Sequence, residues 1–430
     1  MTIDMIQFAA AKEGFSLVGV TPATTPAGYP DLLQWIDDGY AADMHYFANR
    51  RDAYQNPESI LSGVNSLIML AYPYPAPEKT PAFKNNAADA SHHDDQHGDS
   101  KISIPNNHLS GLVARYASTG EDYHEVLHPK LKRLCSIIEN QYPESKTRGI
   151  VDTAPLMERE FANLAGLGWI GKNTLLLNKY HGSYFFLACV LTTLSFESST
   201  PHETAHCGSC TACLDACPTD AFPEPGRLDA SRCISYLTIE HRDAVPLELR
   251  EKMGHWLFGC DICQEVCPWN RKPTKRWETQ QREILNQESD NTITLTQGND
   301  PPSHATVEVP QTHNLMAPPM NLASINLSQL FDMDDEAFRR VFRKTPLWRP
   351  RRRGILRNAA IVLGNQRDPD AIPALSLGLK DREPLVRGAS AWALGQIHHH
   401  SIKSLLETQQ QEETDQQVWS EIDLALRKSL

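Results

Sequence analysis

Eight cysteines, gathered between residues 207 and 267, constrain what this chain can fold into more than any other feature of its sequence. Four have the spacing C-x2-C-x2-C-x3-C before a proline, one follows alone, and three have the spacing C-x2-C-x3-C before a proline. In order, they are Cys207, Cys210, Cys213, Cys217, Cys233, Cys260, Cys263 and Cys267. Thiolates at the first spacing are ligands of [4Fe–4S] clusters in bacterial ferredoxins. We therefore expect a ferredoxin-like unit with two clusters.

The fourth cysteine of such a run ligates the other cluster in two-cluster proteins. This crossing predicts one set of Cys207, Cys210, Cys213 and Cys267 and a second set of Cys217, Cys233, Cys260 and Cys263. The alternative metal is zinc, whose structural sites favour pairs of C-x2-C and close with four ligands. The closely spaced triplet and the two Cys-Pro ends favour iron–sulfur. The two remaining cysteines, Cys135 and Cys189, lie in apolar patterns and are expected in the core.

Length and composition exclude several classes of protein. A chain of 430 residues predicts two or three domains, and 40% hydrophobic with 22% charged residues is ordinary for a globular protein. The longest strongly apolar run, residues 184–191, is far shorter than the roughly 20 residues of a membrane-spanning helix. The N-terminus lacks the basic start and apolar block of a signal peptide. We therefore expect a cytoplasmic protein without membrane segments.

Patterning along the chain predicts three folded parts. Residues 1–196 alternate helical and strand-like patterns, include a buried strand candidate in SLIMLAYPY, and are interrupted by a polar insertion at residues 85–104. Residues 197–272 hold the cysteine-rich unit, and a Gln/Asn/Thr-rich insertion follows at residues 273–316. Residues 317–430 are helical, and RNAAIVLGN and RGASAWALGQ within them are self-similar at a distance of about 30 residues. Such a repeat is typical of HEAT-type helices.

The stretch GLGWIGKN, residues 166–173, matches G-x-G-x-x-G and nearly matches the phosphate-binding G-x-x-x-x-G-K-[ST]. Both nucleotide motifs require a strand before the glycines and a helix after them. Here a helical pattern precedes and a strand-like run follows, and Asn173 replaces the required hydroxyl. The sequence therefore favours a glycine-rich turn whose backbone approaches some other large ligand.

Longer stretches of the sequence resemble the epoxyqueuosine reductase family. They are VDTAPLMEREFANLAGLGWIGKNTLLLN, CGSCTACLDACPTDAF, RCISYLTIE, LFGCDICQEVCPWN and WRPRRRGILRNAAI. Members of this family are oxidoreductases that use cobalamin and two [4Fe–4S] clusters to reduce the epoxide of epoxyqueuosine in tRNA, the last step of queuosine biosynthesis. The resemblance implies an α+β multidomain fold: a flavin-reductase-like α/β domain that binds cobalamin, a two-cluster ferredoxin-like domain, and C-terminal α-helical HEAT-like repeats that bind tRNA.

The resemblance also implies a role for Asp152, which lies in VDTAP and matches the proposed proton donor of the family. Opening an epoxide requires a proton at the departing oxygen, and a positioned carboxylic acid can supply it. A useful acid must keep its proton near neutral pH, so we expect Asp152 to be buried beside the corrin ring. The structural alternative is that Asp152 or Thr153 caps a helix that begins at Pro155.

The same resemblance implies which positions of this chain contact cobalamin. The matching residues are Tyr54, Ala114, Asp152, Leu176, Asn178 and Leu187, with Asp261 as a further candidate. The alternative for each of these residues is that it belongs only to the core or to a turn and does not contact cobalamin. Tyr54 stands where the family often has an arginine, so either Arg50 or Arg51 replaces that arginine or the contact is lost.

Residues 338–357 hold nine Lys or Arg and no acidic residue, in a chain whose net charge is −12. Such a stripe neutralises RNA phosphates in a salt-dependent manner, and Trp348 could stack on an unpaired base. We expect the tRNA anticodon stem-loop to contact Arg349, Arg351, Arg352 and Arg353. The alternative is a solvated helix end with Trp348 in the core.

Two other functions compete with the reductase. A different cobalamin and iron–sulfur enzyme, such as a reductive dehalogenase, would usually carry a twin-arginine export signal and lack a basic HEAT-like tail. A ferredoxin-like electron carrier, or a tRNA-binding scaffold with structural clusters, would not need about 200 residues before the clusters. The reductase requires an external electron donor, such as a reductase, a flavodoxin or a ferredoxin. We expect a monomer, since no coiled-coil pattern is present.

Overall fold

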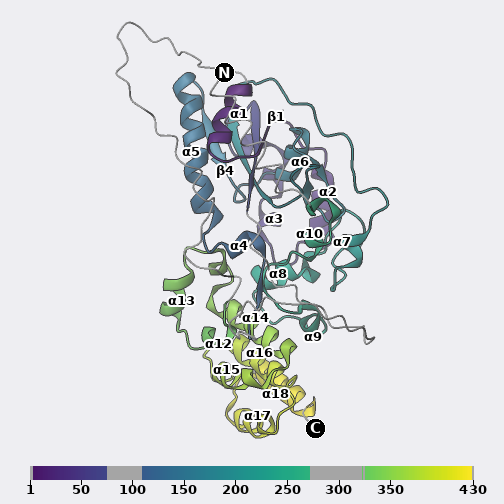
Figure 1. Ribbon diagram of the computed structural model, residues 1–430, viewed down its shortest axis with the longest axis vertical. Helices are drawn as coiled ribbons and strands as arrows, with labels where there is room; N and C mark the ends of the chain where they lie inside the picture. Colours follow the sequence, from purple (N-terminus) through teal and green to yellow (C-terminus); the bar gives the residue numbers. More distant parts are fainter. Residues whose placement is uncertain (1–2, 75–108, 272–321, 323–324, 429–430) are drawn as a thin grey trace, which may run out of the picture.

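The computed structural model describes residues 3–74, 109–271, 322 and 325–428, so the two predicted insertions, at residues 85–104 and 273–316, lie outside the described residues. The chain runs from an N-terminal sheet, through the cysteine-rich segment, to a helical C-terminal part at the opposite end of the molecule (Figure 1). Within the described residues, no helix is both long and apolar enough to cross a membrane.

A four-stranded antiparallel sheet organises the first part. Its strands, in spatial order, are β1 (Leu17–Pro22), β2 (Ser66–Pro73), β7 (Phe185–Thr192) and β4 (Thr147–Ile150). The two central strands pair with Met69 opposite Cys189. The strand predicted in SLIMLAYPY is therefore confirmed as β2.

Helices cover both faces of this sheet. Ile68, Leu70 and Tyr72 of β2 face α1 (Ile3–Lys12) and α5 (Tyr123–Gln141). The alternate residues of β2, starting at Leu67, face α6 (Glu158–Leu164) on the other side. Because β2 and β7 are buried on both faces, their sequences read as continuous apolar runs. Cys189 is fully buried and Cys135 is partly buried in this core, as predicted.

Shorter elements connect the sheet to the rest of the molecule. They are α2 (Tyr29–Asp37), α3 (Tyr46–Asn49), β3 (Leu112–Val113), α4 (Arg115–Ser118), β5 (Trp169–Ile170) and β6 (Leu176–Leu177). β5 and β6 form a hairpin across the glycine-rich turn. β3 pairs in parallel with β8 (Trp256–Phe258) of the cysteine-rich segment, so the first two parts share a small sheet.

The cysteine-rich segment contains short helices. They are α7 (Ala212–Asp215), α8 (Ile234–Ile239), α9 (Leu247–Arg250) and α10 (Ile262–Glu265). α7 and α10 each lie within one of the two cysteine runs, and they pack against each other. The two runs are thereby held side by side.

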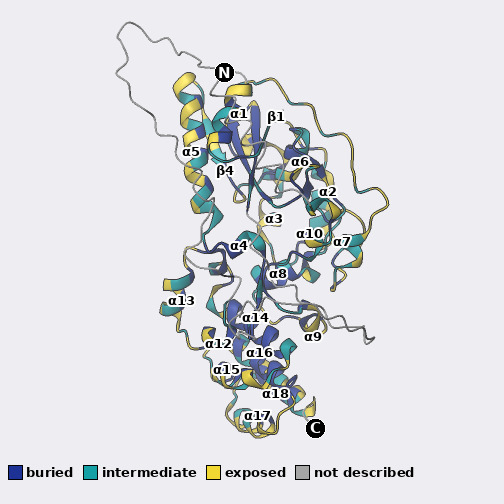
Figure 2. Cartoon of the chain, viewed as in Figure 1, coloured by how far each residue is buried: buried dark blue, intermediate teal, exposed yellow. Residues whose placement is uncertain are grey.

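The C-terminal part is a stack of helices, as the repeat predicted. They are α12 (Leu327–Leu330), α13 (Asp335–Phe342), α14 (Arg351–Gln366), α15 (Ile372–Gly378), α16 (Pro384–Leu394), α17 (Ser401–Glu412) and α18 (Gln416–Lys428). α14 packs on α16, which packs on α18, and both α14 and α16 are largely buried (Figure 2). A Cβ atom at Gly364 would lie 2.7 Å from the Trp392 ring, so the glycine permits this close helix packing.

Two adjacent residues of α14 join the helical part to the cysteine-rich segment. Arg357 is 1% exposed and donates to the backbone carbonyls of Leu237, His241 and Asp243 and to the side-chain carbonyl of Asn358. Asn358 in turn donates to two further backbone carbonyls of that segment, on α8 and β8. Burial lowers the pKa of Arg357 to about 9. Arg357, at the end of the basic stretch, is therefore a structural residue.

Replacing Arg357 by Met should destabilise the protein by about 3 kcal/mol or more, because three buried backbone carbonyls would lose their donor. Thermal unfolding followed by circular dichroism measures this loss as a lower Tm. The matched control is Arg353→Met, which removes an exposed arginine from the same helix. A melting temperature equal to that of the control would contradict the structural role of Arg357.

Candidate functional site

A cavity of about 780 Å³ lies where the three parts of the molecule meet. The N-terminal part contributes residues of α4 and α5 and the loop that carries Asp152. The cysteine-rich segment contributes Cys233 and one side of α8, and the helical part contributes Arg349, Arg351 and Arg353. The cavity therefore collects a carboxylate, a predicted cluster ligand and several predicted RNA contacts.

Asp152 lies in a bend before α6 and has a left-handed backbone conformation, with φ 58°. Its side chain is 59% exposed, so the chain alone does not bury this carboxylate, and its burial beside a corrin ring stays a prediction. The capping alternative is wrong, because α6 begins at Glu158 with Met157 at the N-cap position. The backbone N–H of Asp152 instead donates to Oε1 of Glu158 at 2.9 Å. This bond holds the bend and directs the Asp152 side chain to the cavity.

Two aromatic side chains of α5 face the Asp152 carboxylate. The hydroxyl of Tyr123 donates to Oδ2 of Asp152 at 2.7 Å, and the Tyr123 ring stacks between Phe186 and His124. Burial and the Asp152 charge raise the pKa of Tyr123, so its hydroxyl remains a hydrogen-bond donor at neutral pH. His124 Nε2 lies 3.9 Å from the same carboxylate oxygen.

His124 is held by Asp122, whose Oδ1 lies 2.8 Å from its Nδ1. Burial alone would lower the pKa of His124, but the hydrogen bond and charge of Asp122 raise it above the ordinary value. The Nε2 atom is buried and has no hydrogen-bond partner within the described part of the chain. Asp152 thus faces the Tyr123 hydroxyl and the His124 imidazole.

Glu158 is a functional candidate that the sequence reasoning missed. Burial and the adjacent Asp152 carboxylate raise the pKa of Glu158 to about 8, so it keeps its proton at pH 7. The sequence signal was weak, since an acidic residue in the first turn of a helix is ordinary. The hydrogen bond between Asp152 and Glu158 is visible only in the structure, where the bend turns the Asp152 N–H toward the Glu158 carboxyl group.

The basic stretch divides into an exposed and a buried group. Arg349, Arg351 and Arg353 are exposed and line the cavity, and Arg349 also forms an ion pair with Glu240 at 2.6 Å. Arg352 is only 11% exposed and is engaged by the Asp381 carboxylate at 2.6 Å and by a backbone carbonyl. The guanidinium of Arg352, one of the four arginines predicted to contact tRNA, is thus engaged within the protein.

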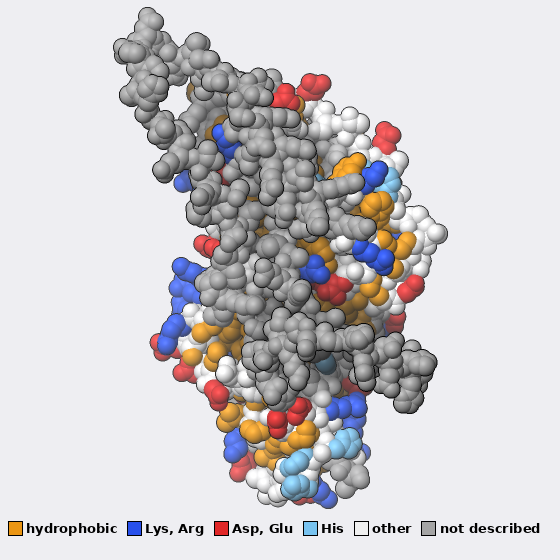
Figure 3. Space-filling model, in the orientation of Figure 1, with side chains coloured by type: hydrophobic (Ala, Val, Ile, Leu, Met, Phe, Trp, Pro, Cys, Tyr) orange, Lys and Arg blue, Asp and Glu red, His pale blue; other side chains and the backbone are white. Residues whose placement is uncertain are grey.

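Further basic side chains lie outside the cavity, and Trp348 lies at its edge. Arg339, Arg340, Arg343 and Lys344 are exposed on α13 and just after it, and Figure 3 shows Lys and Arg side chains grouped at this level of the molecule.

Trp348 is partly buried, packs on Phe338, and carries the Arg351 guanidinium 4.2 Å from its ring centre. Trp348 thus packs partly against the core, and its stacking on an unpaired base stays a prediction.

The cysteines of both runs lie in one region of the structure, and their division into the two predicted sets of four stays a prediction. Burial raises the pKa of the Cys213 thiol, and the nearby Cys267, Cys207 and Cys210 raise it further. Burial raises the pKa of the Cys263 thiol, and Cys233, Asp261, Cys213 and Cys217 contribute to the increase. Burial also raises the pKa of the Cys260 thiol, with contributions from Cys233 and Cys263. The first predicted set would join three thiols of the first run to Cys267, and the second set would join two thiols of the second run to Cys217 and Cys233.

The predicted cobalamin contacts, Asp152 apart, do not line the cavity. Leu176 and Ala114 are buried in the core, Leu187 is partly buried on β7, and Tyr54 packs on Phe47. The Asn178 side chain is used within its own turn, where it donates to Leu167 and accepts from the N–H groups of Tyr180 and His181. Of the two candidate replacements for an arginine at position 54, Arg50 donates to the Thr153 carbonyl in the Asp152 loop, whereas Arg51 pairs with Asp37.

Asp261 fastens one cysteine run to the N-terminal part. It is 2% exposed, and its carboxylate accepts hydrogen bonds from the Arg115 backbone N–H at 2.7 Å and the Gln264 amide at 2.9 Å. Burial raises the pKa of Asp261 to about 6. The side chain therefore holds the loop beside Cys260 against the start of α4.

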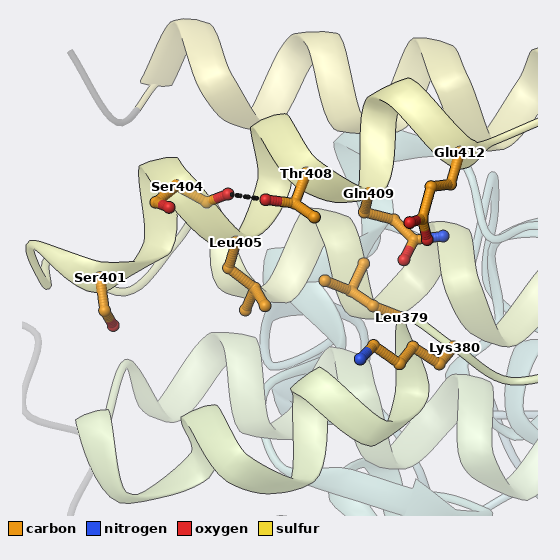
Figure 4. Close-up of a pocket in the computed structure, with 8 residues that line it drawn as sticks. All are labelled: Leu379, Lys380, Ser401, Ser404, Leu405, Thr408, Gln409 and Glu412. Carbon is orange, nitrogen blue, oxygen red and sulfur yellow. Dashed lines mark hydrogen bonds between the residues drawn. The ribbon is translucent and has the colours of Figure 1, made fainter.

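A second, smaller cavity of about 350 Å³ lies on the helical part, between the end of α15 and α17 (Figure 4). Its charged side chains are Lys380 and Glu412, and none of the predicted site residues lies in it. It offers no combination of a nucleophile, an acid or a metal-binding set.

Comparison with known proteins identifies the family. The chain is 34% identical over 396 residues to the epoxyqueuosine reductase of Escherichia coli, covering 92% of this chain and 89% of that protein. The chain belongs to the epoxyqueuosine reductase family. It is therefore an oxidoreductase of tRNA queuosine biosynthesis. Family models match at residues 55–153 (Epoxyqueuosine reductase QueG, DUF1730), 206–270 (4Fe-4S double cluster binding domain) and 352–427 (HEAT repeats).

Solved epoxyqueuosine reductases share the architecture of this chain. One was crystallised with an epoxyqueuosine-modified tRNA-Tyr stem loop; it is 29% identical, has a TM-score of 0.79, and the match covers 99% of this chain and 98% of that one. Another, from Bacillus subtilis, was solved with an aspartate-bearing catalytic loop swung out of the active site; it is 28% identical, with a TM-score of 0.76 and the same coverage. The mixed sheet and helix fold, the double-cluster domain and the HEAT-like repeats are thereby confirmed.

The proton on Glu158 predicts a pH-dependent stability. Between the ordinary pKa of 4.5 and about 8, the unfolded chain releases this proton while the folded protein keeps it, so stability falls as pH rises. Glu158→Gln removes this loss and can still accept the Asp152 N–H. The variant should therefore gain about 2 kcal/mol over the wild type as pH rises from 5 to 8, given about 1.4 kcal/mol per pH unit and partial solvent screening.

Thermal unfolding at several pH values measures this gain. Glu125→Gln, which removes an exposed glutamate on α5, is the matched control and should show no such pH dependence. A constant difference between wild type and Glu158→Gln across this range would contradict the raised pKa of Glu158.

Proposed function

We propose that this protein reduces the epoxide of epoxyqueuosine in tRNA to give queuosine, with cobalamin and two [4Fe–4S] clusters as cofactors and Asp152 as the proton donor. The observation that carries this proposal is the cavity itself. It brings Asp152 and its proton-bearing neighbours together with Cys233 and exposed arginines. A proton source, an electron source and a phosphate-binding edge are the three elements that this reaction on RNA requires.

The thiols fit two [4Fe–4S] clusters. Cys207, Cys210, Cys213 and Cys267 would hold the first cluster, and Cys217, Cys233, Cys260 and Cys263 the second. Cys210 is exposed, whereas Cys233 lies in the cavity wall, so the two sets span the distance from the surface to the site. An external one-electron donor, such as a reductase, a flavodoxin or a ferredoxin, would meet the protein near Cys210.

Unsatisfied polar atoms near Ala114 support the cobalamin part of the proposal. Within the described residues, the Arg115 Nε, the Thr119 hydroxyl and the Tyr184 hydroxyl are buried without hydrogen-bond partners. The Arg115 guanidinium lies 4.3 Å from the Tyr184 ring centre, so two of these atoms belong to one cluster. Buried polar atoms left without partners in a native protein call for a ligand or water. The amide side chains of a corrin would supply such partners.

When bound, the clusters supply single electrons and cobalamin supplies the low-valent cobalt that reduces the epoxide. The chain supplies the proton and the geometry. Tyr123 donates to Oδ2 of Asp152, which leaves Oδ1 to carry the proton toward the epoxide oxygen. Glu158 and Arg50 hold the loop through the Asp152 N–H and the Thr153 carbonyl. Arg50 thereby takes the place of the arginine expected at Tyr54.

The exposed arginines would hold the tRNA stem-loop beside the cavity. Arg351 and Arg353 have no ion-pair partner within the described residues, whereas Arg349 forms an ion pair with Glu240. Guanidinium groups at this edge can bind phosphates while the modified base enters the cavity. We expect the protein to carry out this reaction as a monomer.

The proton donor is best tested with Asp152→Asn. Asparagine tolerates positive φ, whereas alanine would strain the backbone at this position. Anaerobic protein would be mixed with epoxyqueuosine-containing tRNA and a strong reductant, with cobalamin added or withheld, and the nucleosides analysed by mass spectrometry. We expect the cobalamin-dependent loss of one oxygen to slow by about 100-fold or more.

The control for this test is Asp31→Asn, at an exposed position on α2. A wild-type rate in Asp152→Asn would require another proton donor in the cavity. A wild-type protein that holds both cofactors and leaves epoxyqueuosine unchanged would overturn the proposed substrate, and halogenated aromatics would be tested next.

The arginines predict a salt-dependent binding change. Arg351→Gln and Arg353→Gln should each weaken binding of the stem-loop and reduce the slope of log K against log salt by about one. Fluorescence anisotropy over a range of salt concentrations measures both quantities. Arg427→Gln, at an exposed position on α18, is the control. An unchanged slope in both variants would place the RNA on another surface.

A further inference from the structure

The glycine-rich turn at residues 166–173 lies against the first cysteine run, although none of its residues is a cysteine. The ammonium of Lys172 donates to the backbone carbonyls of Gly208 at 2.7 Å and Cys210 at 3.0 Å. Both carbonyls belong to the loop that carries the first three cysteines. A positive charge is therefore fixed directly against the predicted first cluster loop.

Trp169, in the same turn, covers this group of thiols from the protein side. It is 2% exposed and packs with Cys207 and Cys267, and Trp269 meets its ring edge to face at 5.2 Å. Its indole nitrogen is buried and has no hydrogen-bond partner within the described part of the chain. A buried N–H without an acceptor is costly, which indicates that an acceptor outside the protein chain completes it.

The turn is held rigidly in this position. A Cβ atom at Gly168 would lie 2.0 Å from the Leu177 carbonyl oxygen, so only glycine permits the close approach of the turn to β6. At the other end, the Asn173 amide donates to the Cys263 carbonyl at 3.4 Å, and the Lys172 carbonyl accepts from the Gly226 N–H. The turn thus contacts both cysteine runs at once.

We propose that this turn is a clamp for the first iron–sulfur cluster, in which Lys172 fastens the cysteine loop and Trp169 donates its indole N–H to a cluster sulfur atom. The inference rests on the iron–sulfur part of the proposed function and is independent of cobalamin and tRNA. A fixed positive charge and a hydrogen bond to sulfur both favour the reduced, more negative cluster. The clamp therefore raises the reduction potential of the first cluster.

The test uses the full-length protein, reconstituted anaerobically with iron and sulfide, without cobalamin or tRNA. Iron content is measured, and each cluster's reduction potential is determined by a redox titration followed by electron paramagnetic resonance. Trp169→Phe keeps the ring and removes the N–H, so we expect full iron content with one cluster shifted to a more negative potential. Lys172→Met should shift the same cluster in the same direction, and Lys172→Arg should restore the wild-type potential.

Two comparisons make the result decisive. Lys179→Met removes an exposed lysine beyond β6 and should leave both potentials unchanged. Cys210→Ser, which alters a ligand of the first set, identifies the signal that belongs to that cluster. Unchanged potentials in both Trp169→Phe and Lys172→Met, or a shift confined to the second cluster, would overturn the clamp. Failure to reconstitute any cluster in the wild type would instead overturn the iron–sulfur part of the proposed function.

Discussion

The contact between the two cysteine runs is the constraint on which the rest of the structure depends. α7, from the first run, packs against α10, from the second. In the proposed ligand sets Cys213 joins Cys267 and Cys263 joins Cys217, so neither run would complete its set of four thiols alone. The N-terminal part joins the cysteine-rich segment through the pairing of β3 with β8, and the helical part joins this segment through α14. The cysteine-rich segment is thus the hub that fixes the other two parts around one cavity.

The contacts that fix these parts are buried and polar rather than only apolar. Asp261 accepts two hydrogen bonds from uncharged donors, and Arg357 donates to uncharged carbonyl oxygens. A buried charge that meets dipoles of defined direction is satisfied in one orientation only, since a lost partner leaves an uncompensated group. Such contacts specify how the parts dock more sharply than an apolar interface, which tolerates small shifts.

Much of this fold could be predicted from the sequence, because its strongest signals are local. The cysteine spacing predicted the double-cluster domain, and a continuous apolar run identified β2. The basic stretch shows the limit of such reasoning. Its composition does not reveal that Arg352 and Arg357 point inward, because that depends on which side of α14 meets Asp381 and the end of α8. The partnership of Glu158 with Asp152 was likewise hidden, since it depends on one residue with positive φ.

The exposure of Asp152 is consistent with a site that is completed by its ligands. A carboxylate in contact with water gives up its proton at neutral pH, so an acid catalyst needs cover at the moment of reaction. The chain fixes the position of the group in advance: Tyr123 donates to the Asp152 side chain, and Glu158 holds the loop through the Asp152 N–H. A corrin and a modified base that fill the cavity would exclude the remaining water. The acid is then formed only in the assembled complex, which protects the site from proton transfer to solvent while the cavity is open.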